Sequence, residues 1–272
     1  MLVNRRLRKI ALRCIVSIFQ NFFFLQYKAA LFSGSIPVSQ VDHPLDELIP
    51  FTPRRIAVYL DFVAFWVRLI GFLLKTYKRS AEAVVLDFLE SMGRLYGFAA
   101  EVYKENLSTT KRPFYIGRPR FAVIHIMDPH LMCIPSLHVM VVIHTYTKFK
   151  EILQNFGEAG KNASLIEKVR SGALAITEAV LYVKQHSVNC ISAAMYAMTR
   201  FNAELFPDKE AALFVDALFI KSDAIGGEDA GKIRGHILSL YRRFADEGRS
   251  ASSWKEPLLA FLRSFPKKRS AR

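Results

Sequence analysis

Apolar residues recur along most of this chain at the three- and four-residue spacing of an amphipathic α-helix. The clearest stretch has an apolar face made of Val85, Phe88, Leu89, Met92, Leu95, Tyr96 and Ala99. Its opposite, polar face carries Asp87, Glu90, Ser91 and Arg94. The same spacing returns between Ile233 and Phe244, and no alternating strand pattern of useful length competes with it. The pattern therefore predicts an all-α fold, arranged as a helical bundle.

Proline and glycine residues interrupt the helical pattern in several places. These breaks lie at residues 33–53, 108–119, 157–162 and 226–231. The first break is long for a connection inside a compact domain, so we expect it to run over the surface. We therefore divide the chain into residues 1–52, a basic amphipathic N-terminal helix with an extended connection, and residues 53–272, a helical domain.

The charge balance predicts an anionic partner. The chain carries 38 Lys and Arg against 24 Asp and Glu, a net charge of +14, which suits a phosphate ester, a lipid head group or nucleic acid. Nucleic acid is not expected, because the basic residues are scattered and the aromatic residues follow the apolar faces. Three cysteines without a CxxC pair indicate neither a disulfide framework nor a zinc site, and we predict no metal and no cofactor.

The N-terminus combines a basic cluster with an apolar run. The basic residues are Arg5, Arg6, Arg8, Lys9 and Arg13, and the apolar run ends with residues 22–25. Three interpretations remain open: an amphipathic helix lying on anionic lipid, a first membrane helix held by its positive flank, or a core helix with a solvated basic end. The apolar stretch 56–75 contains Asp61 and Arg68, whose insertion cost roughly cancels the apolar gain. Insertion into a membrane is therefore undecided by composition.

Three short segments, in order, carry candidate chemistry. The first is KRPFYIGRP at residues 111–119, in which Lys111 and Arg118 stand seven apart before a proline. The second is PSLH at residues 135–138, and the third is KQHSVN at residues 184–189. This order resembles the type 2 phosphatidic acid phosphatase and vanadium haloperoxidase superfamily, with its motifs K-x6-R-P, P-S-x-H and S-R-x5-H-x3-D. The residues of the second and third segments are most similar to those of the branch that includes inositol phosphorylceramide synthases and other lipid phosphotransferases.

The resemblance implies a metal-independent phosphatase or phosphotransferase that acts on a lipid-linked phosphate through a phosphohistidine. His186 would be the nucleophile, and His138 the general acid that protonates the leaving oxygen. The phosphate oxygens would be held by charge and by hydroxyl and backbone N–H donors at a helix start. The residues expected in that role are Lys111, Arg118, Ser136 and Lys184. Residues 53–272 would form a phosphatase-like domain with the phosphate site between its core helices.

The third segment departs from the family pattern. Val180 stands where the motif has arginine, with Lys184 the nearest basic substitute, and Asn189 is the nearest replacement for the downstream carboxylate. Residues three apart share a helix face, so we expect Asn189 to orient His186. Asn189 supplies no charge to stabilise an imidazolium. A catalytically weak or inactive relative is therefore one alternative, and Asp128 and Glu178 are other acids that could reach His186.

The lipidic substrate class and the basic, apolar N-terminus together predict association with a membrane, either at its surface or inserted, with a cytoplasmic location as the alternative. The rival function is a noncatalytic basic helical protein bound to anionic membrane or nucleic acid. The two functions differ in whether His138 and His186 face one phosphate-sized space. His125, His130 and His144 have no partner pattern and are expected to be structural. The sequence predicts no oligomeric state.

Overall fold

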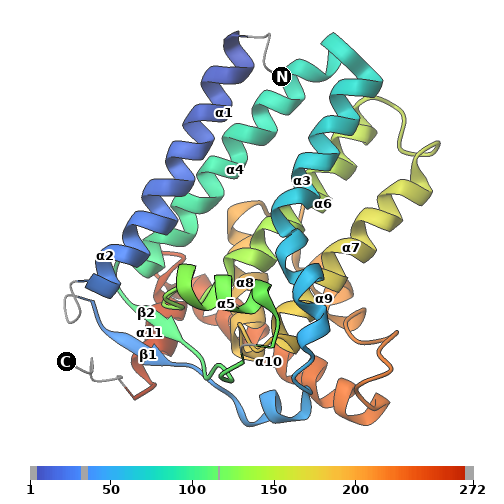
Figure 1. Cartoon of the computed structure of the whole chain (residues 1–272). Coiled ribbons are helices and arrows are strands. Elements are labelled where there is room, and N and C mark those ends of the chain that lie inside the picture. Colours follow the sequence, from blue (N-terminus) through green and yellow to red (C-terminus); the bar gives the residue numbers. More distant parts are fainter. Residues whose placement is uncertain (1–4, 32–35, 116, 267–272) are drawn as a thin grey trace.

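The computed structural model describes residues 5–31, 36–115 and 117–266, and nearly all regular structure in them is helical (Figure 1). The N-terminal helices are α1 (Arg5–Ile18), a π-helical segment (Phe19–Phe24) and α2 (Leu25–Leu31). They are followed by α3 (Ile56–Tyr77), α4 (Glu82–Tyr103), α5 (Pro119–Met127), α6 (Leu137–Asn155) and α7 (Ala163–Tyr182). The last four are α8 (Val188–Phe201), α9 (Asp208–Asp216), α10 (Gly227–Ser250) and α11 (Glu256–Arg263). The predicted all-α class is confirmed.

Helices α1, α3, α4, α6 and α7 extend toward one end of the molecule, and α10, α11 and the two strands lie at the other end (Figure 1). Short 3-10 turns at Pro44–Leu48, Pro53–Arg55 and Lys78–Ala81 connect or precede the long helices. The predicted break at 157–162 separates α6 from α7, and Gly157 there has a φ of +68°, which favours glycine. This hairpin returns α7 along α6, so the end of α7 lies near the start of α6.

A two-stranded parallel sheet, which the hydrophobic pattern did not predict, fastens the connection between α2 and α3. Strand β1 (Val38–Gln40) pairs with β2 (Leu107–Thr109), and Val38 lies opposite Leu107. Three residues are too few for a period-two signal to stand out. The connection is also not wholly on the surface as expected, because Val41 and Ile49 are buried. The segment is therefore part of the core and helps to position the site.

The N-terminal helix packs along α4 (Figure 1). Ile10 and Cys14 are buried, and Ser17 Oγ donates a hydrogen bond to the carbonyl of Gly93 at 2.9 Å. A single buried apolar cluster extends from Ile10 to Leu262, so residues 1–52 and 53–272 share one core. The outer face of the same N-terminal segment is apolar and exposed at Leu12, Ile15, Val16, Phe19 and Phe24.

Helix α4 covers the predicted amphipathic stretch, with one correction to its faces. Ser91, assigned to the polar face, is buried and bonds to His144 Nε2 at 2.9 Å. His144 also stacks on Phe88, with the ring centroids 5.7 Å apart. Tertiary packing against α6 therefore places a polar pair on a helix face that periodicity alone counted as solvated.

Within the described part of the chain, two helical stretches are long and apolar enough to cross a membrane. They are Arg8–Leu31 and Pro53–Tyr103. In the most apolar 18 residues of each stretch, 17% of the first and 33% of the second are buried. Length and composition alone give this result, and a core helix of a soluble protein passes the same criteria.

Candidate active site

The first turn of α6 and the turn before α8 meet at the centre of the molecule. The backbone N–H of Ser136, the residue that precedes α6, donates to the carbonyl of Cys190 at 3.4 Å. This contact places His138, in the first turn of α6, beside His186, which lies in the turn between α7 and α8. Pro135 ends the preceding segment, so α6 begins where the second motif does.

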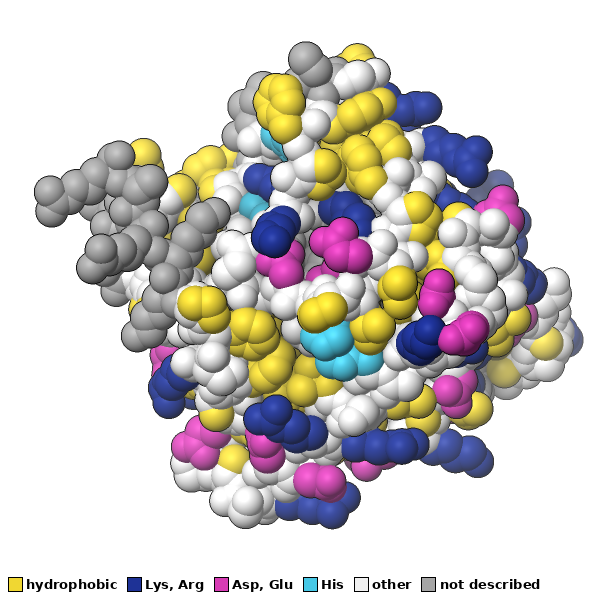
Figure 2. Space-filling model, turned by 90° about the horizontal axis from the view of Figure 1, so that it is seen from below, with side chains coloured by type: hydrophobic (Ala, Val, Ile, Leu, Met, Phe, Trp, Pro, Cys, Tyr) yellow, Lys and Arg dark blue, Asp and Glu magenta, His cyan; other side chains and the backbone are white. Residues whose placement is uncertain are grey.

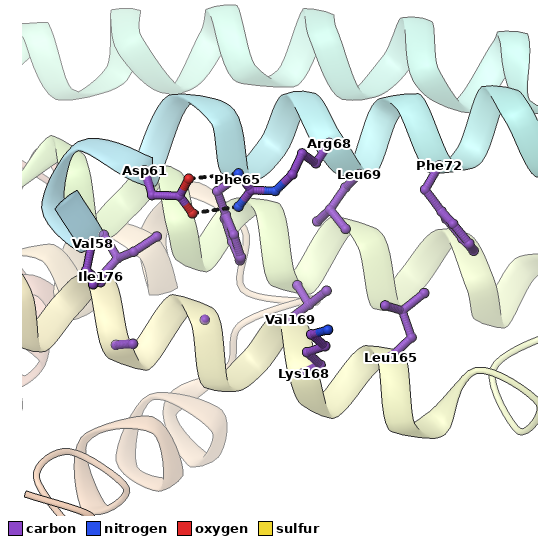
Figure 3. Close-up of a pocket in the computed structure, with 12 residues that line it drawn as sticks. Val58, Asp61, Phe65, Arg68, Leu69, Phe72, Leu165, Lys168, Val169 and Ile176 are labelled. Carbon is purple, nitrogen blue, oxygen red and sulfur yellow. Dashed lines mark hydrogen bonds and ion pairs between the residues drawn. The ribbon is translucent and has the colours of Figure 1, made fainter.

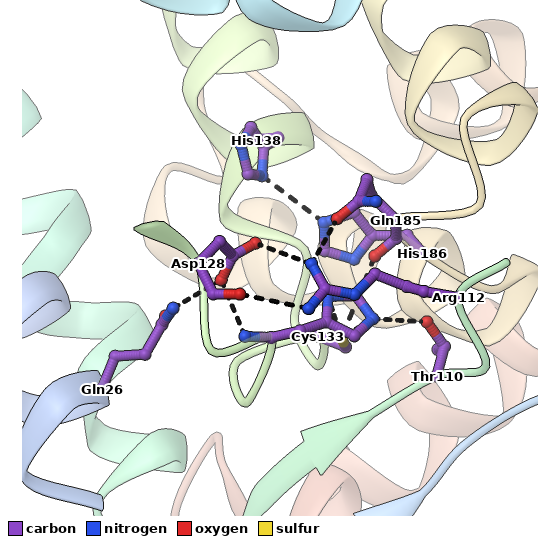
Figure 4. A network of polar contacts seen from close by, with 9 residues as sticks. Gln26, Thr110, Arg112, Asp128, Cys133, His138, Gln185 and His186 are labelled. Atoms are coloured by element: carbon purple, nitrogen blue, oxygen red, sulfur yellow. Dashed lines mark hydrogen bonds and ion pairs between the residues drawn. The ribbon is translucent and has the colours of Figure 1, made fainter. Parts of the chain in front are cut away.

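Two histidines from different motifs are in direct contact (Figure 4). His138 Nδ1 and His186 Nε2 lie 3.4 Å apart, although 48 residues separate them in the chain. Aromatic rings of α3 pack around His138, with Tyr59 at 4.8 Å and Phe62 at 4.4 Å between ring centroids. The fold therefore brings together the two imidazoles that the resemblance assigns to the nucleophile and the general acid.

Desolvation lowers the pKa of both imidazoles, with His186 buried and His138 half-buried. Desolvation lowers the pKa of His138 to about 4, and the nearby Asp128 carboxylate opposes that shift. Desolvation, and then the proximity of His138, lower the pKa of His186 well below its usual range. His186 Nδ1 is buried and has no hydrogen-bond partner among the described residues. A neutral His186 has the free lone pair that a nucleophile needs. His138 must be protonated to act as a general acid, and a nearby anion would favour that protonated form.

The cation at this site is Arg112. Its guanidinium donates to Gln185 Oε1 at 3.2 Å and to the carbonyl of Asp128 at 3.1 Å, and it lies 3.9 Å from the Asp128 carboxylate. Figure 4 shows this network beside the two histidines. Lys111 and Arg118, the cations predicted from the first motif, are exposed instead. Arg112 is half-buried, whereas Lys111 is exposed and its backbone N–H donates to Asp42 Oδ1 at 2.8 Å.

Ser136 and Lys184 have different outcomes. Ser136 Oγ is buried at the N-terminus of α6 and has no hydrogen-bond partner in the described residues, so a donor is available there. Lys184 adopts a φ of +55°, and its Nζ donates to the backbone carbonyl of Asp46. The ammonium group of Lys184 is thus committed to the 3-10 turn at Pro44–Leu48 and not to a phosphate site.

Asn189 does not orient His186. Its Nδ2 donates to the carbonyl of Val41 at 3.1 Å, and its Oδ1 accepts from His236 Nε2 at 2.8 Å. The prediction failed because His186 lies before α8, where the i,i+3 relation of a helix does not apply. Counted by the motif, the fourth residue after His186 is Cys190, and its sulfur accepts the N–H of Ser187 at 3.4 Å. The carboxylate expected downstream in the chain therefore has no counterpart at either position.

Sequence spacing missed several residues that line the same cavity. Asp128, kept only as an acid within possible reach, accepts the N–H of His130 at 2.8 Å. His130, expected to be structural, bonds to Thr110 Oγ1 at 2.8 Å and lies 3.6 Å from Cys133 Sγ. These residues precede the second motif by a few positions. Their position shortly before the second motif is the signal that the sequence gives, because no fixed spacing identifies them.

The cavity between these side chains is small, about 10 Å³, which is room for at most one water molecule. The N-terminal segment closes it, because Phe22 and Gln26 line the cavity together with both histidines. Gln26 Nε2 donates to Asp128 Oδ1 at 2.5 Å and is buried. A phosphate group does not fit this cavity unless some of the lining side chains move.

The remaining candidate chemistry lies outside this cavity. No group of three or more His, Cys, Asp or Glu among the described residues is arranged to hold a metal ion.

One face of the molecule shows histidine side chains near its centre, with Lys or Arg and Asp or Glu interspersed around them (Figure 2). Comparison of this chain with models of protein families, with curated proteins and with solved structures gives no match.

Proposed function

We propose that this protein is a metal-independent phosphatase or phosphotransferase that acts on a lipid-linked phosphate through a phosphohistidine. The observation that carries the proposal is the 3.4 Å contact between His138 Nδ1 and His186 Nε2. Two imidazoles from separate motifs meet beside the N-terminus of α6, where no side chain caps the first-turn N–H groups and an anion is favoured. Arg112 adds a planar cation beside them.

The reaction uses His186 Nε2 as the nucleophile. Nε2 forms a bond to phosphorus while the bond between phosphorus and the leaving oxygen breaks, and His138 gives its Nδ1 proton to that oxygen. In the second step water or an alcohol attacks phosphorus, His138 Nδ1 takes the proton of the attacking oxygen, and the P–N bond breaks. The negative phosphate raises the pKa of His138 from its low value in the free protein, which supplies the acid.

Three groups hold the phosphate oxygens in this mechanism. Arg112 turns the Nη1–H that it donates to Gln185 toward the phosphate, and Ser136 Oγ, which has no partner among the described residues, donates a second hydrogen bond. The backbone N–H groups in the first turn of α6 have no acceptor within the helix, and they complete the anion site. Lys111, Arg118 and Lys184 do not contact the phosphate in this mechanism.

The lipidic substrate class follows from the segment that covers the cavity. The N-terminal segment carries Phe22 and Gln26 on its inner side and exposed Leu12, Ile15 and Phe19 on its outer side. Contact of the outer side with lipid and withdrawal of the inner side from the cavity would therefore occur in one element. This arrangement links opening of the site to arrival at a membrane surface.

The test is a turnover assay with and without vesicles. Full-length protein is given phosphatidate in vesicles, a water-soluble diphosphate and p-nitrophenyl phosphate, each in the presence of EDTA, and acid-labile phosphoenzyme is trapped. We expect turnover by the wild type, loss of turnover and of phosphoenzyme in His186→Ala, and retained activity in His125→Gln, a histidine outside the cavity. Absence of turnover and phosphoenzyme on every substrate, by protein that still binds vesicles, would overturn the enzyme proposal in favour of the noncatalytic membrane-bound rival.

A specific observation favours a second candidate, a catalytically weak or inactive relative. His186 Nδ1 has no carboxylate partner among the described residues, and the cavity in this state holds no more than one water. In a triad hydrolase, loss of the corresponding charge lowers turnover by about 10⁴. Phosphoenzyme that forms and then persists, with release of phosphate far slower than its formation, would identify this candidate.

A further inference from the structure

A second hollow, of about 380 Å³, lies between α3 and α7 (Figure 3). None of its lining residues lines the cavity of the two histidines. Its walls are mainly aliphatic and aromatic: Val58, Phe65, Leu69, Leu165, Val169 and Ile176. A volume in this range is typical of sites for small organic ligands.

Small residues on α7 let the Phe65 ring of α3 pack close to the α7 backbone inside the groove. Gly172 and Ala175 face it, and a Cβ at Gly172 would lie 2.8 Å from Phe65 Cε2. On α3 the lining extends from Val58 to Phe72, about 21 Å at the helical rise per residue. An apolar groove of that length fits a single extended hydrocarbon chain better than a compact ring system.

The charges at the rim of the groove select the head group of that chain. Arg68 and Asp61, both on α3, form a bidentate pair with N–O distances of 2.7 and 2.5 Å, which satisfies the guanidinium (Figure 3). Lys168 on α7 is exposed and makes no ion pair among the described residues. The rim therefore offers one uncompensated positive charge, which matches a monoanionic carboxylate and leaves a dianionic phosphate ester half neutralised.

We infer that the groove between α3 and α7 binds a long-chain fatty acid, with the hydrocarbon chain along Val58 to Phe72 and the carboxylate on Lys168. Burial of the chain removes from water both its methylene groups and the exposed apolar walls of the groove. The inference is independent of the phosphatase proposal, because the groove and the histidine cavity share no lining residue.

Photolabelling tests the inference. Full-length protein in phosphatidylcholine nanodiscs is labelled with diazirine-bearing myristate, and mass spectrometry locates the labelled residues. We expect label on the α3 and α7 residues that line the groove, competed by myristate and much less by tetradecanol, which lacks the charge. Uniform labelling of the lipid-facing surface, or equal competition by tetradecanol, would overturn the inference.

Two pairs of matched variants separate groove binding from general adsorption. Ala175→Leu fills the groove and should abolish its labelling, whereas Ala163→Leu, on the same helix but exposed and outside the groove, should leave labelling unchanged. Lys168→Gln should weaken competition by myristate about two- to fivefold, as expected for an exposed charge pair, while Lys161→Gln has no effect. Unchanged labelling and competition in Ala175→Leu and Lys168→Gln would contradict the assignment.

Discussion

The side-chain amide of Gln26 donates a hydrogen bond of 2.5 Å to the Asp128 carboxylate, across 102 residues of sequence. Asp128 also contacts Arg112, so one carboxylate joins the N-terminal segment to the cation of the candidate active site. Gln26 and Phe22 line the cavity that also holds the two histidines. The N-terminal segment is therefore a structural part of the site and not an appendage to it.

The first prediction concerns this cover. Gln26→Ala removes the bond to Asp128, so we expect kcat/KM on p-nitrophenyl phosphate to rise several-fold while activity on vesicles changes little. The free energy of unfolding should fall by about 1.5–3 kcal/mol, the usual loss for a hydrogen bond to a charged group. Gln20→Ala, an exposed glutamine of the same segment, is the matched control. Equal activity of wild type and Gln26→Ala on the soluble substrate would show that the segment does not limit access.

The adjacent cations Lys111 and Arg112 give the second prediction. Arg112 faces the site, whereas the Lys111 side chain is exposed and only its backbone N–H is bound, to Asp42 Oδ1 at 2.8 Å. Arg112→Gln should lower kcat by about 10²–10³, the loss typical when one donor to a transition-state anion is removed. Lys111→Gln should leave kcat within twofold. The reverse ranking would restore the motif's own lysine to the phosphate site.

Asn189→Asp is the third prediction, and its direction follows from the contacts of Asn189. Restoring a carboxylate beside His186 would raise turnover only if the two residues met, but Asn189 bonds Val41 and His236 instead. The new carboxylate loses the donor to the Val41 carbonyl at a buried position, so we expect turnover not to rise and the free energy of unfolding to fall by about 1–3 kcal/mol. A higher kcat measured on phosphatidate vesicles would contradict this placement of Asn189.

The fourth prediction concerns pH. His138 has a lowered pKa of about 4 in the folded protein, so between pH 6.5 and pH 4 the unfolded chain binds a proton that the folded chain does not. This contribution to stability is present above pH 6.5 and is lost as the pH falls toward 4, at up to about 1.4 kcal/mol per pH unit. Urea unfolding at pH 7, 6 and 5 measures the slope. We expect a smaller slope in His138→Gln, and an identical slope would mean that His138 titrates normally when folded.

Membrane attachment supplies the fifth prediction. Ile15 and Phe19 are 51% and 60% exposed on the outer face of the N-terminal segment. Changing both to serine should weaken binding to anionic vesicles at least tenfold, because each large apolar side chain that enters lipid contributes about 1.5–3 kcal/mol. Leu213→Ser, at an apolar residue of α9 with 48% exposure, is the control in a vesicle sedimentation assay. If the double variant sediments like the wild type, another surface holds the protein on lipid.

The sequence by itself determined the helices and the meeting of the two motif histidines. Apolar spacing of three and four depends only on the geometry of one helix, so the stretch from Val85 to Ala99 could be placed in α4 without knowing its neighbours. Glycine and proline mark chain reversals locally, and the break at 157–162 lies between α6 and α7 as expected. The motif order similarly pointed to His138 and His186 as one pair.

Only the tertiary structure decided which other groups reach that pair. Arg112 faces the site in place of Lys111 because its guanidinium is held by Gln185 and by the Asp128 carbonyl, whereas the backbone N–H of Lys111 is bound to Asp42. Asn189 bonds His236, 47 residues away, because α8 begins after His186 and turns Asn189 toward α10. Such contacts depend on how whole helices pack, and a hydrophobic pattern specifies which face of a helix is buried but not which partner covers it.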